Sequence, residues 1–144
     1  MQFTYLKHDF YRYIYPDDSV TKVRLLKKIQ IIISTQGIWA ITVYRLSRWT
    51  FYECQYKVVR LLLKPIIFFL QIAVQVLTGI LLDPRIDIGP GFYIGHFGSI
   101  ILGGDIRIGK FCNISQGNTF GIAGRGDNRG VPELGDFVYV APGA

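Results

Sequence analysis

The sequence predicts an α+β protein in which an N-terminal helical segment is followed by a parallel β-helix built from hexapeptide repeats. Two observations support this fold class. Residues 1–82 carry eleven Lys and Arg against four acidic residues, a net charge of +7, whereas residues 83–144 carry five basic and six acidic residues, a net charge of −1. Aliphatic residues in the second part recur every six positions. The chain therefore divides into a helical region, 1–82, and a repeat domain, 83–144.

Apolar residues at helical spacing predict helices in the first part. One lies within residues 17–34, where Asp and Ser residues precede apolar positions interspersed with Lys and Arg. A second runs through residues 37–53, and Trp39, Val43 and Leu46 are expected to share its buried face.

A third helix is expected after Pro65 and is the one candidate for contact with a membrane. Residues 66–82 are dominated by apolar side chains, but they are slightly fewer than the roughly 20 that cross a bilayer, and Gln71 and Gln75 fall on one face. Three interpretations remain open: a helix packed in a helical subdomain or trimer interface, a helix lying in the membrane interface, and a membrane span. An interfacial helix would have cations near the lipid headgroups, namely Lys57, Arg60 and Lys64.

The second part has a period of six. An aliphatic or aromatic residue, often followed by Gly, recurs in three series: Ile88, Ile94 and Ile100; Leu102, Ile108, Ile114 and Phe120; Leu134 and Val140. This pattern is typical of a β-helix in which each hexapeptide forms a short strand and a turn, and three hexapeptides complete a triangular coil. The aliphatic side chains stack inside the coil.

Two segments interrupt the period. The spacing between Ile94 and Leu102 is eight, so the segment around His96 is predicted to bulge from a corner by two residues. Residues 121–133 are rich in Gly and charged residues and should be extruded from the coil as a loop. Loops on a rigid scaffold often contact ligands. A solvated loop without a ligand and a surface imidazole at an irregular corner remain the alternatives.

Composition excludes several other classes. No nucleic-acid-binding motif accompanies the basic excess, so we expect no nucleic-acid partner. Cys54 and Cys112 lack metal-ligand spacing and predict reduced, packed thiols without a metal site. The aromatic and charged N-terminus is unlike a signal peptide. These features predict a cytoplasmic protein, located at the inner face of the membrane if its N-terminal helices make peripheral contact with lipid.

Four stretches of the second part resemble the left-handed β-helix acyltransferases, specifically the serine acetyltransferase group: "IGPGFYIGHFGSIILGG", "IGKFCNISQGNTFG", "IAGRGDNRGVP" and "ELGDFVYVAPGA". The eight-residue step at His96, the following coil, the Gln-x-x-Thr-x-Gly segment and the loop have the same order and lengths in that family. The resemblance covers residues 83–144, is weaker over 35–82, and does not extend to 1–34.

The resemblance implies transfer of an acetyl group from acetyl-CoA, as co-substrate, to a hydroxyl, in a site between adjacent subunits of a homotrimer. It implies that His96 is the general base, which suits the chemistry, because imidazole titrates near neutral pH and an alcohol needs its proton removed to attack. It also places four residues near the acyl end of CoA: Gln116, Asn118, Gly121 and Ala123. No metal is expected.

The sequence departs from the serine acetyltransferase pattern at three places. That family has Asp immediately before the His, where this chain has Gly95. It has Arg-His-Pro at the end of the loop, where this chain has Gly-Val-Pro at 130–132. The Asp expected to pair with the catalytic His falls on Leu81. A serine zwitterion needs charged partners at both ends, so these losses favour a neutral acceptor.

We therefore expect a saccharide acceptor, either a small molecule or lipid-linked, because relatives with an altered loop resemble the O-acetyltransferases of capsule and exopolysaccharide biosynthesis. The residues expected near the acceptor are Gly95, Arg125 and Arg129. Two alternatives remain open. One is serine O-acetylation in cysteine biosynthesis, and the other is a β-helix that binds or trimerises without catalysis.

The chain ends at Ala144, within the repeat. No capping segment follows the last predicted coil, although an open β-helix end exposes unpaired strand edges. In the family that the chain resembles, further coils complete the CoA groove. We therefore expect the chain to be a fragment truncated at its C-terminus.

Overall fold

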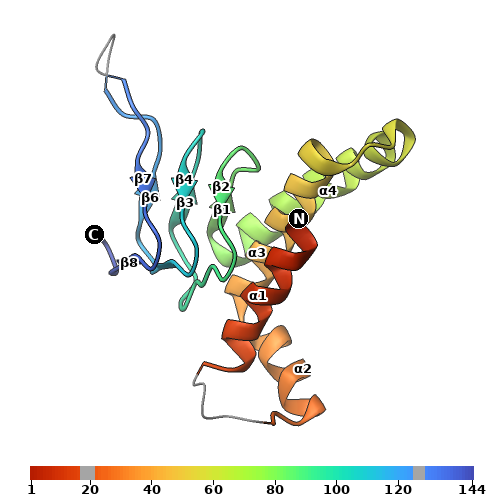
Figure 1. Ribbon diagram of the computed structural model, residues 1–144, viewed down its shortest axis with the longest axis vertical. Helices are drawn as coiled ribbons and strands as arrows, with labels where there is room; N and C mark the ends of the chain where they lie inside the picture. The colour runs from red at the N-terminus through yellow and green to blue at the C-terminus, as the bar shows by residue number, and fades with distance from the viewer. Residues whose placement is uncertain (17–21, 125–128) are drawn as a thin grey trace.

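The computed structural model describes residues 1–16, 22–124 and 129–144. Helices come first, and short strands follow in stacked coils, with the C-terminus at the end of the coils that lies farthest from the helices (Figure 1). The helical part consists of α1 (Gln2–Ile14), α2 (Leu25–Ser34), α3 (Gln36–Arg48), a π-helical turn η1 (Trp49–Glu53) and α4 (Lys57–Thr78). The predicted α+β class is confirmed.

The strands wind into a parallel β-helix with three sheets. They are β1 (Ile80–Leu82), β2 (Asp87–Ile88), β3 (Ile100–Leu102), β4 (Arg107–Ile108), β5 (Asn113–Ile114), β6 (Thr119–Phe120), β7 (Glu133–Leu134) and β8 (Tyr139–Val140). The first sheet has the order β1-β3-β6, the second β2-β4-β7, and the third pairs β5 with β8. A bridge between Tyr93 and Asn113 extends the third sheet. The six-residue period thus predicted the coil correctly.

Each hexapeptide of the first two coils places two side chains in the core. The aliphatic residue that marks the period is buried, and so is the residue two positions earlier, because side chains alternate along a strand. These earlier positions are at most 2% exposed: Ile80, Ile86, Phe92, Ile100, Ile106 and Cys112. Cys112 is therefore a core residue, and burial raises the pKa of its thiol. Cys54 is also buried and free, as expected for packed thiols.

The helices cover the open edge of the first coil and hydrogen-bond to its backbone. N–H and C=O groups on this edge have no preceding strand, and such groups are costly when they are buried unpaired. The Tyr44 hydroxyl of α3 donates to the Ile86 carbonyl (2.7 Å) and accepts the Ile88 N–H (3.2 Å). Burial raises the pKa of Tyr44 to about 12, so the phenol keeps the proton that it donates.

Arg45 of α3 and Asp9 of α1 form the centre of this cap. Both side chains are 1% exposed, and Arg45 Nε lies 2.8 Å from Asp9 Oδ2. Arg45 also donates to the carbonyls of Ile88 and Gly89, each at 2.6 Å. Asp9 accepts the N–H of Phe92 at 2.8 Å. Burial raises the pKa of Asp9 against the opposing effect of Arg45. A buried ion pair needs such additional hydrogen bonds to offset its desolvation, and the first coil supplies them.

α4 differs from the predicted third helix at both ends. It begins at Lys57, so Pro65 lies inside it on the exposed side, where water can solvate the carbonyl left without a partner. It ends before Gly79, whose left-handed conformation (φ 66°) stops the helix. Ile80–Leu82 form β1, so the coil begins three residues before the predicted boundary at residue 83.

The buried face of α3 is not the predicted one. Trp39, Val43 and Leu46 are only partly buried, and the fully buried positions include Ile38, Ala40, Ile41, Tyr44 and Arg45. α3 contacts α1, α4 and β1, so it buries a wide face that includes polar residues. In the predicted helix at residues 17–34, the structure confirms Leu25–Ser34, and residues 17–21 lie outside the described residues.

Replacing Arg45 by Met should disrupt the cap. The Asp9 carboxylate would then be buried without its cation, which costs about 3–5 kcal/mol in the free energy of unfolding measured by chemical denaturation. The control is Arg85→Met, because the Arg85 side chain is 55% exposed in its pair with Asp83, and an exposed ion pair contributes little to stability. Equal losses in the two variants would contradict the capping role.

The loss of unfolding free energy caused by Arg45→Met should also depend on pH. Burial raises the pKa of Asp9, so the folded state binds this proton more tightly than the unfolded state. Stability from such a group is lost as the pH rises through the raised pKa and recovered as the pH falls. Arg45 opposes this rise, so Arg45→Met should raise the pKa of Asp9 further. The difference in unfolding free energy between wild type and Arg45→Met should therefore shrink towards acidic pH, where Asp9 is protonated in both proteins.

Candidate functional site

His96 lies on a bulge at the corner between the third sheet and the β1-β3-β6 sheet. Ile80 pairs with Ile100, a spacing of 20 residues for the coil that contains the bulge. Leu102 pairs with Phe120 in the next coil, a spacing of 18. The two extra residues confirm the predicted insertion.

The backbone on both sides of His96 is fixed. The Tyr13 hydroxyl of α1 accepts the Ile94 N–H (2.7 Å) and donates to the Ile94 carbonyl (3.0 Å). Burial raises the pKa of Tyr13, so the phenol stays protonated. Beyond His96, positive φ angles at Gly98 (103°) and Ser99 (52°) turn the chain into β3. His96 itself is exposed, so its imidazole is accessible from solvent on a fixed corner.

α3 approaches the segment before His96 through Gly37. A Cβ at this position would lie 2.5 Å from the carbonyl oxygen of Ile94 and 2.7 Å from the hydroxyl of Tyr13, far inside van der Waals contact. Glycine therefore permits the close approach of α3 to Ile94, two residues before His96.

Gln116 lies beside the His96 corner, one coil further along the β-helix. The N–H of Gly117 donates to the Gly98 carbonyl at 3.3 Å, and the carbonyl of Gln116 accepts the N–H of Gly143 at 3.1 Å. The side-chain oxygen of Gln116 is buried and has no hydrogen-bond partner among the described residues. The structure thus brings Gln116 close to the backbone that carries His96.

Asn118, which was expected to contact CoA, has a structural role in the same corner. Its side chain is 0% exposed, and its amide nitrogen donates to the carbonyls of Ser115 and Ala141, each at 2.8 Å. Its side-chain oxygen, like that of Gln116, is buried and has no hydrogen-bond partner among the described residues.

The predicted loop leaves the coil between β6 and β7 and extends beyond the coils (Figure 1). Its two arms pair through Ala123 and Gly130, each of which donates its N–H to the other's carbonyl at 2.9 Å. A groove of about 600 Å³ follows these arms and is lined in part by Gly121, Ala123 and Val131. Two of the residues expected near CoA therefore share one groove.

The predicted site residues occupy two different corners within one chain. Gly95 and His96 are exposed at the first corner, and the loop, with Arg129 exposed on it, leaves the second. The sheet of β1, β3 and β6 separates the two corners. Arg125 lies outside the described residues.

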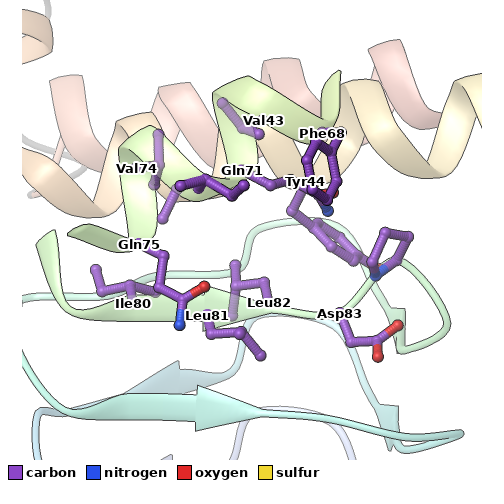
Figure 2. A pocket seen from close by; sticks show the side chains of 13 residues that line it. Val43, Tyr44, Phe68, Gln71, Val74, Gln75, Ile80, Leu81, Leu82 and Asp83 are labelled. Carbon is purple, nitrogen blue, oxygen red and sulfur yellow. The ribbon is translucent and has the colours of Figure 1, made fainter. Parts of the chain in front are cut away.

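A separate cavity of about 260 Å³ lies between α3, α4 and β1. Figure 2 shows Gln75 of α4 reaching towards Leu81 of β1, whereas Gln71, Val43 and Phe68 lie farther from this strand. His96 is not among the described residues that line this cavity, so the cavity is distinct from the His96 corner.

Comparison with known proteins identifies the relatives of this chain. No protein-family model matches it. The serine acetyltransferase of Staphylococcus xylosus is 29% identical over 116 residues, which are 81% of this chain and 50% of that protein. The serine acetyltransferase of Helicobacter pylori is 31% identical over 117 residues, which are 81% of this chain and 64% of that protein. The chain is a homologue of the serine acetyltransferases.

Solved structures agree with this relationship at the level of the fold. A serine acetyltransferase in complex with CoA matches with a TM-score of 0.71 at 20% identity, covering 99% of this chain and 52% of that one. The likeness includes the helices as well as the coils, because nearly the whole chain is covered. The chain spans about half the length of the first curated relative and of this structure.

Sequence reasoning missed the residues that position the His96 corner, above all Tyr13, Gly37 and Arg45. A signal was present in α1, where Gln2, Asp9 and Tyr13 are the buried residues. Their spacing of seven and four places them on one helix face. Aliphatic residues at the same spacing would have indicated a core face. Gln2 and Asp9 are polar, so hydrophobic periodicity did not identify the face.

Replacing Tyr13 by Phe should destabilise the protein while preserving the ring. The N–H and carbonyl of Ile94 would lose their buried partner, at a cost of about 1–3 kcal/mol in unfolding free energy. Tyr11→Phe is the control, since Tyr11 is 53% exposed and its change should stay within about 0.5 kcal/mol. If the two variants were equally stable, Tyr13 would not hold the corner.

Gly37→Ala tests the close approach of α3. The added methyl group should displace Ile94 and lower the unfolding free energy by about 1–3 kcal/mol in denaturant titrations. Gly103→Ala is matched to it, because a Cβ there meets nothing within 4 Å. A Gly37→Ala protein as stable as Gly103→Ala would rule out tight packing at this point.

Proposed function

We propose that the protein is an acetyl-CoA-dependent O-acetyltransferase in which His96 is the catalytic base. The observation that carries this proposal is the exposed imidazole on a corner fixed by Tyr13. Homology with serine acetyltransferases, and the CoA complex of one structural neighbour, support acetyl-CoA as the donor. Because the chain spans about half the length of its first relatives, the proposal concerns the whole protein.

His96 would act on the acceptor hydroxyl. Its neutral imidazole removes the hydroxyl proton while the oxygen bonds to the carbonyl carbon of the thioester. Backbone N–H groups in Gly-rich corners stabilise the negative charge on the carbonyl oxygen. The imidazolium then returns the proton to the sulfur as the carbon–sulfur bond breaks. The products are an acetyl ester and CoA.

Gln116 and the loop groove are the proposed contacts of the donor. Gln116 lies beside the His96 corner and has a buried side-chain oxygen without a partner among the described residues. Gly121 and Ala123 line the groove along the two arms of the loop. Asn118 would act indirectly, by holding the corner that carries Gln116.

Serine is the acceptor that the names of the relatives favour. Its carboxylate requires a cation, and Arg129 is exposed on the loop. A serine acceptor would therefore use a loop arginine in place of the Arg-His-Pro that the resemblance leads one to expect at 130–132.

A saccharide hydroxyl is the second candidate, and the residues around His96 favour it. Gly95 precedes the imidazole, and Leu81, in β1, pairs with Ile101. The serine acetyltransferase pattern has Asp at both positions. Gly95 and Leu81 therefore offer no partner for the ammonium group of an amino acid, whereas a neutral hydroxyl needs none.

We propose that the complete site forms between two copies of the chain in a homotrimer. Within one chain, the first sheet separates His96 from the loop. A threefold assembly about an axis along the coils would bring the His96 corner of one copy towards the loop of the next. Both groups of residues would then contact one donor and one acceptor.

Thiol release from acetyl-CoA tests the role of His96. His96→Ala should lower the rate of release by about 100- to 10,000-fold, the usual contribution of a general base. His8→Ala is the matched control, because His8 is the only other histidine and is exposed on α1. Equal rates in both variants would exclude His96 as the base.

The same thiol-release assay, with the wild-type protein and different acceptors, identifies the acceptor. Release with serine and not with monosaccharides or oligosaccharides would establish serine as the acceptor. Release with a saccharide alone would establish the second candidate. Failure of the full-length protein to release thiol with either class would contradict the proposed activity.

A further inference from the structure

The outer face of α4 is apolar and uncovered. Six apolar side chains at helical spacing lie along it, each between 43% and 78% exposed: Val58, Leu62, Ile66, Phe69, Ile72 and Val76. The only fully buried residues of the 22-residue helix are Ile67 and Thr78, on the side that contacts α3 and β1. A continuous apolar face of this length normally has a partner.

The charged residues at the N-terminal end of α4 are all positive. Lys57, Arg60 and Lys64 are the charged residues of α4, and residues 54–82 contain no Asp or Glu. Tyr52 and Tyr56, which precede the helix, are 59% and 75% exposed. Cations and amphipathic rings at one end of an apolar helix face match the headgroup region of an anionic bilayer.

We infer that α4 binds an anionic membrane surface, with its outer face among the acyl chains and its cations at the headgroups. A second copy of α4 fits this face less well. Two copies meeting through α4 would join two positively charged helices with no acidic residue in 54–82 to pair with them. Anionic lipid supplies the opposite charge.

The packing of α4 favours an interfacial position. By length and composition alone, the helix could cross a membrane, with a mean hydropathy of 2.0. However, Ile67 is fully buried, and Gln71 lines the cavity shared with α3 and β1 (Figure 2). A spanning helix would lose both contacts. The uncharged part of the helix, residues 65–78, is only about 21 Å long. The hydrocarbon core of a bilayer is roughly 30 Å thick.

Vesicle co-sedimentation of the full-length protein tests this inference without reference to acetyl transfer. We expect binding to vesicles of phosphatidylcholine mixed with phosphatidylglycerol, and weaker binding to phosphatidylcholine alone. Ile66→Glu/Phe69→Glu should abolish binding, because both side chains lie on the outer face. Ile101→Glu/Phe137→Glu is the matched control, since these residues are 47% and 68% exposed on the coils.

A second pair of variants isolates the charges and leaves the apolar face intact. Lys57→Gln/Lys64→Gln should weaken binding to the anionic vesicles by about 10- to 30-fold. Arg107→Gln/Lys110→Gln changes the net charge equally on the coils and should retain most of the binding. Unchanged binding in Ile66→Glu/Phe69→Glu would overturn the inference. A second result would also overturn the inference. If the wild type self-associates but does not bind vesicles, and Ile66→Glu/Phe69→Glu abolishes the self-association, the partner of this face is a second copy of the chain.

Discussion

The open edge of the first coil is the constraint on which the rest of the structure depends. Its N–H and C=O groups lack a preceding strand, and the ion pair of Arg45 and Asp9 bonds to three of them directly. The hydroxyl of Tyr44 bonds to the backbone of Ile86 and Ile88, and the hydroxyl of Tyr13 bonds to the backbone of Ile94. The dependence is mutual, because the buried ion pair needs these backbone groups to offset its desolvation. Basic helices and neutral repeats therefore form one cooperative structure.

This cap also connects the fold to the candidate site. The last backbone groups that it holds belong to Ile94, two residues before His96. The imidazole thus lies on a corner whose approach is fixed by α1 and α3, although neither helix carries a group that contacts a substrate in the proposed reaction. Loss of a cap residue should affect catalysis through the position of His96, which makes Tyr13 and Gly37 positioning residues.

The coil could be predicted from the sequence because its interior imposes a periodic local pattern, including the eight-residue step at His96. The cap could not, since Asp9 and Phe92 meet across 83 positions and hydrophobic periodicity does not select polar residues. The predicted start of α4 after Pro65 was wrong, because the backbone hydrogen bond that proline cannot form lies on the solvent-exposed side of the helix. The resemblance predicts a contact of Asn118 with CoA, whereas its hydrogen bonds to the carbonyls of Ser115 and Ala141 follow only from the folded corner.

Hydrogen exchange at two backbone amides tests the capping of the first coil most directly. The N–H groups of Phe92 and Ile94 point away from the second coil and donate to Asp9 and Tyr13 respectively. Both amides should exchange only on global unfolding, as slowly as amides in the centre of the coil, and both should be released by Arg45→Met or Tyr13→Phe. Exchange of these two amides as fast as that of the exposed bulge at His96 would contradict a helical cap.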